Sequence, residues 1–320
     1  MALVGIARMA AQSPLVEAKR TVQYFEIAAR SILNRTKPGM PFEWTINPYR
    51  GCEFGCKYCY ARNTYEFMEM PVTDFEDKIY AKSAAAHLLR QELRGIDPRG
   101  AIAIGTATDP YQPAERRFGR TRSILEVFAT QTGWNLGIVT KSDLVTRDTD
   151  LLREIARRNL LSVNLTVTTL DEKLARLLEP RAPRPTLRLE AVTKLSAAGL
   201  RVGVYAKPIL PGLTDSERAL DRLAKASRDA GAVVFGGGPL FLTPAAQKVF
   251  LPFLEEHFPR LAPQYREQFA KSNYLDRPYK NLLAVRLQKL RERYGFDTGP
   301  VDFKPELWAL PEQATLFPLQ

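Results

Sequence analysis

Short apolar runs recur along the middle of the chain, and polar segments separate them. Most of these runs are continuous rather than alternating, which is typical of parallel strands buried on both faces. The predicted strands are residues 44–47, 101–105, 136–140, 162–168, 202–207 and 232–236.

Apolar positions with helical spacing lie between these strands. The predicted helices are residues 82–94, 148–158, 186–198 and 216–230. Gly199 and Gly231 follow the last two and are typical C-terminal caps. The alternation predicts parallel βα units, which right-handed crossovers curl into a barrel or a doubly wound sheet. The local pattern leaves both architectures open.

Two further segments flank the βα series. The expected division of the chain is 1–43, 44–240 and 241–320. The N-terminal extension is expected to pack across the core. The glycine-rich segment 236–239 marks a strong break, and residues 244–258 and Arg277–Tyr294 beyond it have helical patterns. The tail, 300–320, is rich in proline and aromatic residues and is expected to be extended and packed.

Composition narrows the class of protein. The chain has 320 residues, of which 45% are hydrophobic and 25% charged, so whole-chain disorder, collagen and coiled coil are excluded. No apolar run approaches the roughly 20 residues that span a bilayer, and the N-terminus lacks a secretory pattern. We therefore expect a cytoplasmic protein without a membrane partner. The net charge of +11 suits a nucleic-acid partner and equally suits a basic soluble enzyme.

All three cysteines follow the first predicted strand. The gaps between Cys52, Cys56 and Cys59 bring their thiolates into one compact loop, and Gly51 and Gly55 permit sharp turns. Soft thiolates prefer zinc, copper(I) or iron–sulfur clusters. A closed zinc or ordinary cluster site needs four protein ligands, and this chain has no fourth cysteine.

The two histidines are poor substitutes for a fourth ligand. His87 lies in a helical pattern beside leucines and His257 at a predicted helix end, so we interpret both as structural. Three thiolates on a four-iron cluster leave one iron open, and an open metal position is where substrate or cofactor binds. A three-cysteine zinc site is the alternative.

The segment Cys52–Cys59, with an aromatic residue before its last cysteine, resembles the radical S-adenosylmethionine (SAM) superfamily. The resemblance implies a [4Fe–4S] cluster on Cys52, Cys56 and Cys59, with SAM on the fourth iron and Tyr58 on the adenine side. It also implies a partial (β/α)6 TIM-type barrel. The segments similar to the branch that contains spore photoproduct lyase are 47–62, 105–122, 140–152, 166–188 and 198–215.

Ligands of parallel α/β folds bind at the carboxyl ends of the strands. Thr106, Thr108 and Asp109 follow the second predicted strand and are candidates for the methionyl amine or the ribose; a proline-bounded turn is the alternative. Lys141 follows the third strand, and the resemblance favours a role on the cofactor carboxylate over a surface lysine.

Later strands carry further candidates. Thr166 and Thr168 end the fourth strand and offer hydroxyls for the carboxylate or ribose, although threonine is also common in strands for steric reasons. Glu179 and Arg188 are candidates for cofactor contacts or for a structural ion pair. Pro208 belongs to a stretch that flanks the adenine in the family, and ordinary core is the alternative.

The resemblance implies an enzyme that cleaves SAM reductively to a 5′-deoxyadenosyl radical, which takes hydrogen from a substrate. A reductant such as flavodoxin or ferredoxin is implied. Spore photoproduct lyase is expected to use an additional cysteine as hydrogen donor, which this chain lacks, and this difference argues against thymine-dimer reversal. The candidate replacements are Tyr111, Tyr205, Tyr274 and Tyr279.

Three hypotheses follow. The first is a lyase-like radical enzyme acting on nucleic acid or a nucleotide, supported by the charge and by the basic segment Arg277–Tyr294, for which a solvated helix face is the alternative. The second is a radical enzyme acting on a peptide or small molecule. The third is a non-enzymatic metal or electron-transfer protein.

Overall fold

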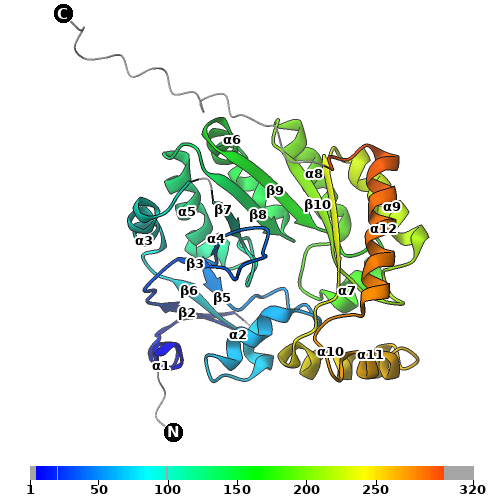
Figure 1. The fold of residues 1–320 in the computed structure, drawn as a ribbon. Helices are drawn as coiled ribbons and strands as arrows, with labels where there is room; N and C mark the ends of the chain where they lie inside the picture. Colours follow the sequence, from blue (N-terminus) through cyan, green and yellow to red (C-terminus); the bar gives the residue numbers. More distant parts are fainter. Residues whose placement is uncertain (1–4, 20, 99, 299–320) are drawn as a thin grey trace, which may run out of the picture.

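A computed structural model describes residues 5–19, 21–98 and 100–298 and contains an open, seven-stranded sheet with the order β11-β10-β9-β8-β7-β4-β3 (Figure 1). The strands are β3 (Leu33–Arg35), β4 (Trp44–Ile46), β7 (Ala101–Ile104), β8 (Asn135–Thr140), β9 (Leu160–Thr166), β10 (Val202–Ile209) and β11 (Val234–Pro239). The six strands from β4 to β11 are parallel and confirm the six predicted runs, whereas β3 pairs antiparallel with β4. The sheet is the expected partial barrel.

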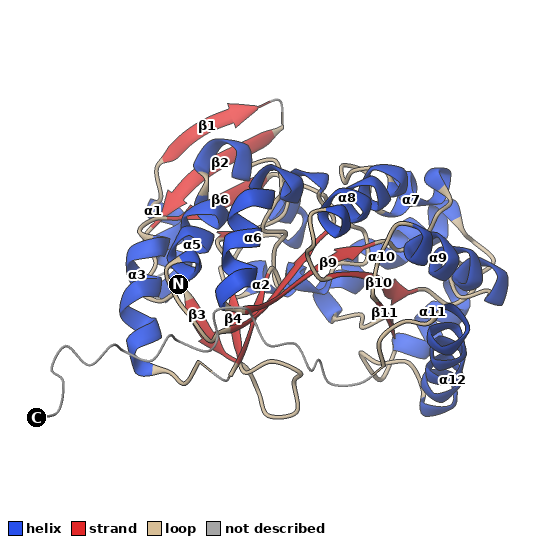
Figure 2. Ribbon diagram, turned by 90° about the horizontal axis from the view of Figure 1, so that it is seen from above, coloured by secondary structure: helices blue, strands red, loops and turns tan. Residues whose placement is uncertain are grey.

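Helices cover one face of this sheet (Figure 2). They are α3 (Ala85–Glu92), α5 (Arg120–Ala129), α6 (Thr149–Arg158), α8 (Pro185–Ala197) and α9 (Glu217–Asp229). The expected C-terminal caps are present, since Gly199 and Gly231 have φ values of +79° and +91°. α5 was not predicted, because its apolar face is interrupted by four polar residues at its start.

The two faces of the barrel sheet differ in side-chain size. The outer face packs against the helices and carries Ile104, Ile138, Val163 and Val204, each fully buried. The inner face carries small residues in register, such as Ala103 with Gly137 and Gly137 with Ser162. Small inner residues differ from the bulky branched residues that fill a closed barrel, and they leave the inner face partly accessible.

A second sheet joins the N-terminal extension to the cysteine region, with the order β1-β2-β6-β5. Its strands are β1 (Leu15–Lys19), β2 (Val22–Ile27), β5 (Tyr49–Arg50) and β6 (Lys78–Lys82). The expectation of a helix from residue 82 was wrong at its start, because Lys82 pairs with Ile27 at the end of β6 and the helix begins at Ala85. Pairing with a distant strand here overrides the local helical pattern.

The C-terminal segment contains α10 (Pro244–His257), α11 (Ala262–Phe269) and α12 (Arg277–Tyr294), so both predicted helices are confirmed. α10 and α11 share a core with the cysteine loop, in which Phe250 and Leu254 pack with Cys52 and Cys56. α12 packs on β11 and α9. The tail 300–320 lies outside the described residues. Among the helices that the structure describes, none is long and apolar enough to cross a membrane.

Candidate cluster and cofactor site

The cysteine loop connects β5 to the short 3-10 helix η1 (Tyr60–Arg62). Gly51 has a φ of +77°, and a Cβ atom at this position would lie 2.4 Å from the Tyr65 hydroxyl and 2.8 Å from two backbone oxygens. Only glycine fits this turn without displacing backbone. The amide of Cys52 donates to the carbonyl of Phe75 (2.9 Å), which ties the loop to the 3-10 helix η2 (Val72–Glu76).

The three thiols occupy a shared, largely enclosed environment. Cys52 and Cys56 are 8% exposed and Cys59 is partly exposed. Burial raises the pKa of each thiol, that of Cys56 to about 12. Neighbouring thiols raise the pKa values of Cys52 and Cys56 further. The raised pKa values favour protonated thiols, whereas a bound metal stabilises the thiolates. Metal binding therefore releases protons.

This donor set fits an iron–sulfur cluster held by three protein ligands, because three soft thiols gather without a fourth cysteine or a nearby histidine. In the described part of the chain, no three or more His, Cys, Asp or Glu side chains lie close enough together to hold a single metal ion.

Arg62, which the sequence analysis did not single out, fixes the loop from inside. Its side chain is fully buried, pairs with Glu76 at 2.6 Å and donates to the carbonyl oxygens of Cys56 (3.2 Å) and Val72 (3.0 Å). Its burial has no local sequence signature, since its carboxylate partner Glu76 lies outside the cysteine loop.

The loop after β7 holds the cysteine loop through side chains predicted to touch cofactor. The Thr108 hydroxyl donates to the Gly51 carbonyl (2.6 Å), and Gln112 donates to the same oxygen (3.2 Å). Asp109 accepts hydrogen bonds from the Thr140 hydroxyl (2.6 Å) and from the Lys141 amide (2.7 Å). Both Thr108 and Asp109 are buried and have partners within the protein.

Thr106 lies at the same strand end but toward the surface. Its hydroxyl accepts a hydrogen bond from the Asn47 side chain (3.2 Å), and its carbonyl accepts one from Tyr60. Tyr60 directly follows the last cysteine, so this contact links the first strand, the cysteine loop and the second strand.

Five predicted residues from separate segments meet at one carboxylate. Glu179 accepts hydrogen bonds from Tyr58 and from Thr168 (2.7 Å), pairs with Arg188 at 2.5 Å and lies 3.8 Å from the Lys141 ammonium. Burial raises the pKa of Glu179, but Arg188 and Lys141 outweigh burial and lower it to about 2. Glu179 is therefore ionised at neutral pH.

The remaining predicted residues lie at the carboxyl ends of β9 and β10. Thr166 is buried at the end of β9, where its carbonyl accepts a hydrogen bond from Arg188 (3.0 Å). Pro208 is partly exposed near the carboxyl end of β10. On the same strand, Tyr205 is in register with Gly236, and the Lys207 ammonium lies 4.9 Å from the centre of the Tyr205 ring.

The four tyrosines proposed to replace the missing cysteine lie in different surroundings. Tyr111 is fully buried, Tyr279 donates a hydrogen bond to Asp215 (3.0 Å) and Tyr274 is 58% exposed. Tyr205 is partly exposed. Because Tyr205 alternates with the outward-facing Val204, it lies on the inner face of the barrel sheet.

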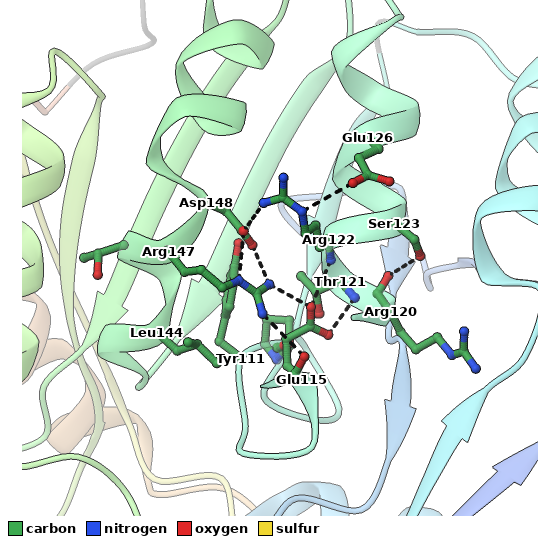
Figure 3. Close-up of polar contacts among 12 residues, drawn as sticks. Tyr111, Glu115, Arg120, Thr121, Arg122, Ser123, Glu126, Leu144, Arg147 and Asp148 are labelled. Carbon is green, nitrogen blue, oxygen red and sulfur yellow. Dashed lines mark hydrogen bonds and ion pairs between the residues drawn. The ribbon is translucent and has the colours of Figure 1, made fainter. Parts of the chain in front are cut away.

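A second buried charge network supports the loops after β7 and β8 (Figure 3). Glu115 accepts hydrogen bonds from Tyr49 (2.5 Å) and from the Thr121 amide (2.8 Å), and it pairs with Arg147 at 3.0 Å. Arg147 also pairs with Asp148 at 2.7 Å. Tyr49 lies in β5, so the network connects both loops to the strand that leads into the cysteine loop.

An open parallel barrel with three clustered thiols after its first strand defines the class of α/β proteins that bind an iron–sulfur cluster. The chain belongs to the radical SAM superfamily, whose family model matches residues 46–224. As a member, it is an enzyme that uses a [4Fe–4S] cluster and SAM.

Relatives extend over most of the chain. A protein of Mycobacterium tuberculosis is 37% identical over 305 residues, which cover 92% of this chain and 88% of the relative. A protein of Methanocaldococcus jannaschii is 28% identical over 260 residues, which cover 80% of this chain and 91% of the relative. Among solved structures, spore photoproduct lyase with a dinucleoside spore photoproduct has a TM-score of 0.62 at 16% identity and covers 85% of this chain and 79% of its own.

Proposed function

We propose that this radical SAM enzyme acts on a nucleic acid or nucleotide, which it binds beside the cysteine loop. The observation that carries the proposal is a row of accessible aromatic rings, Tyr60, Phe241 and Tyr274, which we term the aromatic row. Tyr60 directly follows Cys59, so the row begins next to the proposed cluster ligands.

The proposed cluster ligands are Cys52, Cys56 and Cys59. When bound, the cluster and SAM supply one-electron cleavage of a carbon–sulfur bond and the radical that takes hydrogen from substrate. Lys141 would orient the SAM carboxylate. Its ammonium lies 3.8 Å from ionised Glu179, beyond ordinary hydrogen-bond distance, and therefore retains donors for a second anion. Thr108 and Asp109 would contribute through the loops they hold in place.

The aromatic row suits unstacked bases. The ring centres of Tyr60 and Phe241 are 6.0 Å apart and those of Phe241 and Tyr274 are 4.7 Å apart. Tyr60 is 43% exposed and Tyr274 58%, so both rings offer accessible surface beside the partly buried Phe241. Bases stack on accessible rings of this kind, largely without regard to sequence.

A positive charge accompanies the row. The Lys280 ammonium lies 5.9 Å from the centre of the Tyr274 ring, where it would contact a phosphate beside a stacked base. Three arginines farther along α12 have partners within the fold: Arg286 pairs with Glu217, Arg293 pairs with Asp221 and Arg291 donates to the Phe235 carbonyl. The basic helix thus contributes to substrate binding mainly through its first turns.

Two measurements test this proposal. The first is anaerobic reconstitution followed by an assay for 5′-deoxyadenosine, which tests the radical chemistry. The second is fluorescence anisotropy of labelled single-stranded DNA and RNA over a salt series. Tyr274→Ala should weaken binding by about 5- to 150-fold, since each stacked base contributes about 1–3 kcal/mol.

Phe67→Ala is the matched control, because Phe67 is 72% exposed but is not part of the aromatic row. Lys280→Ala should lower the slope of log affinity against log salt by about 1. A wild-type protein that binds neither oligonucleotide at low salt would refute a nucleic-acid substrate.

A further inference from the structure

A basic groove lies on the surface behind the cysteine loop. It has a volume of about 480 Å³ and runs between α7 (Glu172–Leu178) and the start of α8. The basic residues that line it are Lys173, Arg176, Arg184 and Arg188. Glu172 and Glu179 also line it, and Glu179 is already neutralised by Arg188. The groove therefore presents an excess of positive charge.

The accessible cations of the groove are available to a partner. Lys173 and Arg184 are exposed, and neither forms an ion pair with a carboxylate among the described residues. Arg176 donates to the carbonyl of Pro180 (2.7 Å) and keeps its charge. A surface that retains unpaired cations around a groove is electrostatically complementary to an acidic partner.

Apolar side chains accompany these charges. Leu177 on α7 and Leu187 on α8 are 38% and 39% exposed. Leu177 lines the groove itself. An apolar centre with a charged rim is the usual composition of a protein interface, whereas a phosphate backbone would need only the cations. This combination favours an acidic protein over a polyanionic chain.

The groove lies directly against the cysteine loop. The Lys57 amide donates to the Leu178 carbonyl (2.9 Å), and the Arg181 amide donates to the Phe54 carbonyl (3.3 Å). The segment that lines the groove therefore binds directly to the loop that carries the thiols. A partner in the groove would therefore dock next to the loop that carries the proposed cluster ligands.

We propose that this groove binds a small acidic protein that carries a one-electron donor. The proposal rests on the radical SAM chemistry above, because that chemistry consumes one electron per cleaved SAM. The donor cofactor loses one electron, and the [4Fe–4S] cluster gains it, passing from its 2+ to its 1+ state. No bond forms or breaks in this step, and no proton is required.

The test compares two sources of the same electron in the reconstituted holoenzyme. The variant is Lys173→Glu with Arg184→Glu, and 5′-deoxyadenosine is measured with dithionite and with reduced flavodoxin or ferredoxin. We expect the variant to lose about tenfold or more of the protein-driven rate at low salt, with the dithionite-driven rate unchanged. A loss of about 1.4 kcal/mol of docking free energy corresponds to this factor.

Arg90→Glu with Arg94→Glu is the matched control. Both residues are exposed at the end of the α3 region, which lies across the sheet from α7 in both ribbon views (Figures 1 and 2). This control makes the same change in net charge and should keep the protein-driven rate. The wild-type rate should fall as salt rises, and the rate of the groove variant should respond less.

Several outcomes would overturn the proposal. The first is an equal loss of the protein-driven rate in the groove variant and in the control. The second is a wild-type enzyme that forms 5′-deoxyadenosine with dithionite but with neither donor protein. The third is a groove variant that loses oligonucleotide binding but keeps the protein-driven rate. If the double variant fails to retain its cluster absorbance, Lys173→Ala with Arg184→Ala replaces it under the same criteria. Failure of dithionite to produce 5′-deoxyadenosine in wild type would instead refute the proposed function.

Discussion

Two buried carboxylates, Glu179 and Glu115, lie in similar surroundings but differ in how completely their partners are engaged. Each is nearly inaccessible and contacts a tyrosine hydroxyl and an arginine. Glu115 also accepts two backbone amides, those of Thr121 and Arg122, so its oxygens are fully occupied. We call the network around Glu115 closed, because both carboxylate oxygens are occupied by partners within the protein.

The Glu179 cluster differs because one of its cations is only loosely held. The Lys141 ammonium lies 3.8 Å from Glu179, beyond ordinary hydrogen-bond distance, and its side chain is 15% exposed. Buried charge is therefore a poor marker of a ligand site by itself. An accessible polar group whose donors are not fully used is the better marker.

The largest expected effect comes from the thiols beside the Glu179 cluster. Cys56→Ala should abolish cluster binding, because the remaining two thiolates would ligate only two of the four irons. The fold should persist, because only a loop is changed. Iron content and circular dichroism would check this. A variant with wild-type iron content would remove Cys56 from the ligand set.

The closed network should respond as a structural element. Glu115→Ala leaves Arg147 paired with Asp148 but removes the acceptor of the Tyr49 hydroxyl and of the Thr121 amide. It should lower the free energy of unfolding by about 3–5 kcal/mol, because each buried donor left without a partner costs about 1–3 kcal/mol. Urea unfolding would measure this loss. SAM affinity of the folded fraction should stay near wild type, and a selective loss of affinity would contradict the distinction between the two networks.

The pH dependence of stability should report on Glu179. Because the pKa of Glu179 is lowered from 4.5 to about 2 in the folded protein, its contribution is present above about pH 4.5 and is lost as pH falls toward 2. The shift corresponds to about 3 kcal/mol. Glu179→Gln should remove this part of the pH profile, as measured by urea unfolding from about pH 6 to about pH 2, a range that includes the transition. A variant with the wild-type profile would contradict the assignment.

The smallest effect should come from the loosely held cation. Lys141→Ala should weaken SAM affinity by about tenfold, a difference of about 1.4 kcal/mol, with little change in the free energy of unfolding. Isothermal titration calorimetry on the reconstituted protein would check affinity. Lys173→Ala is a suitable control, because Lys173 is exposed on α7, outside the Glu179 cluster. Unchanged affinity in Lys141→Ala would exclude a role on the carboxylate.

Much of the barrel could be predicted because its signals are local. A continuous apolar run marks a strand that is buried on both faces wherever it pairs, so all six parallel strands were found. The second sheet was missed, because β2 and β6 pair Gln23 with Lys78 across a long intervening segment. Neither strand carries a pattern strong enough to reveal this pairing.

The candidate site shows the same division. The positions of Thr108, Asp109 and Lys141 after their strands follow from local order, but their partners do not. Thr108 and Asp109 bind other loops of the protein, and only the folded chain reveals those contacts. The network around Glu115 lies partly in helical turns, where charged residues are normally solvated.

The amino-acid order alone determined the strands of the barrel, the three clustered thiols and the absence of a fourth cysteine, because each is a property of neighbouring residues. The tertiary structure decided which charges are buried together, which cations remain available and which surface lies behind the cysteine loop. These properties depend on contacts between distant segments, and the free energy of a charge is set by what surrounds it in space.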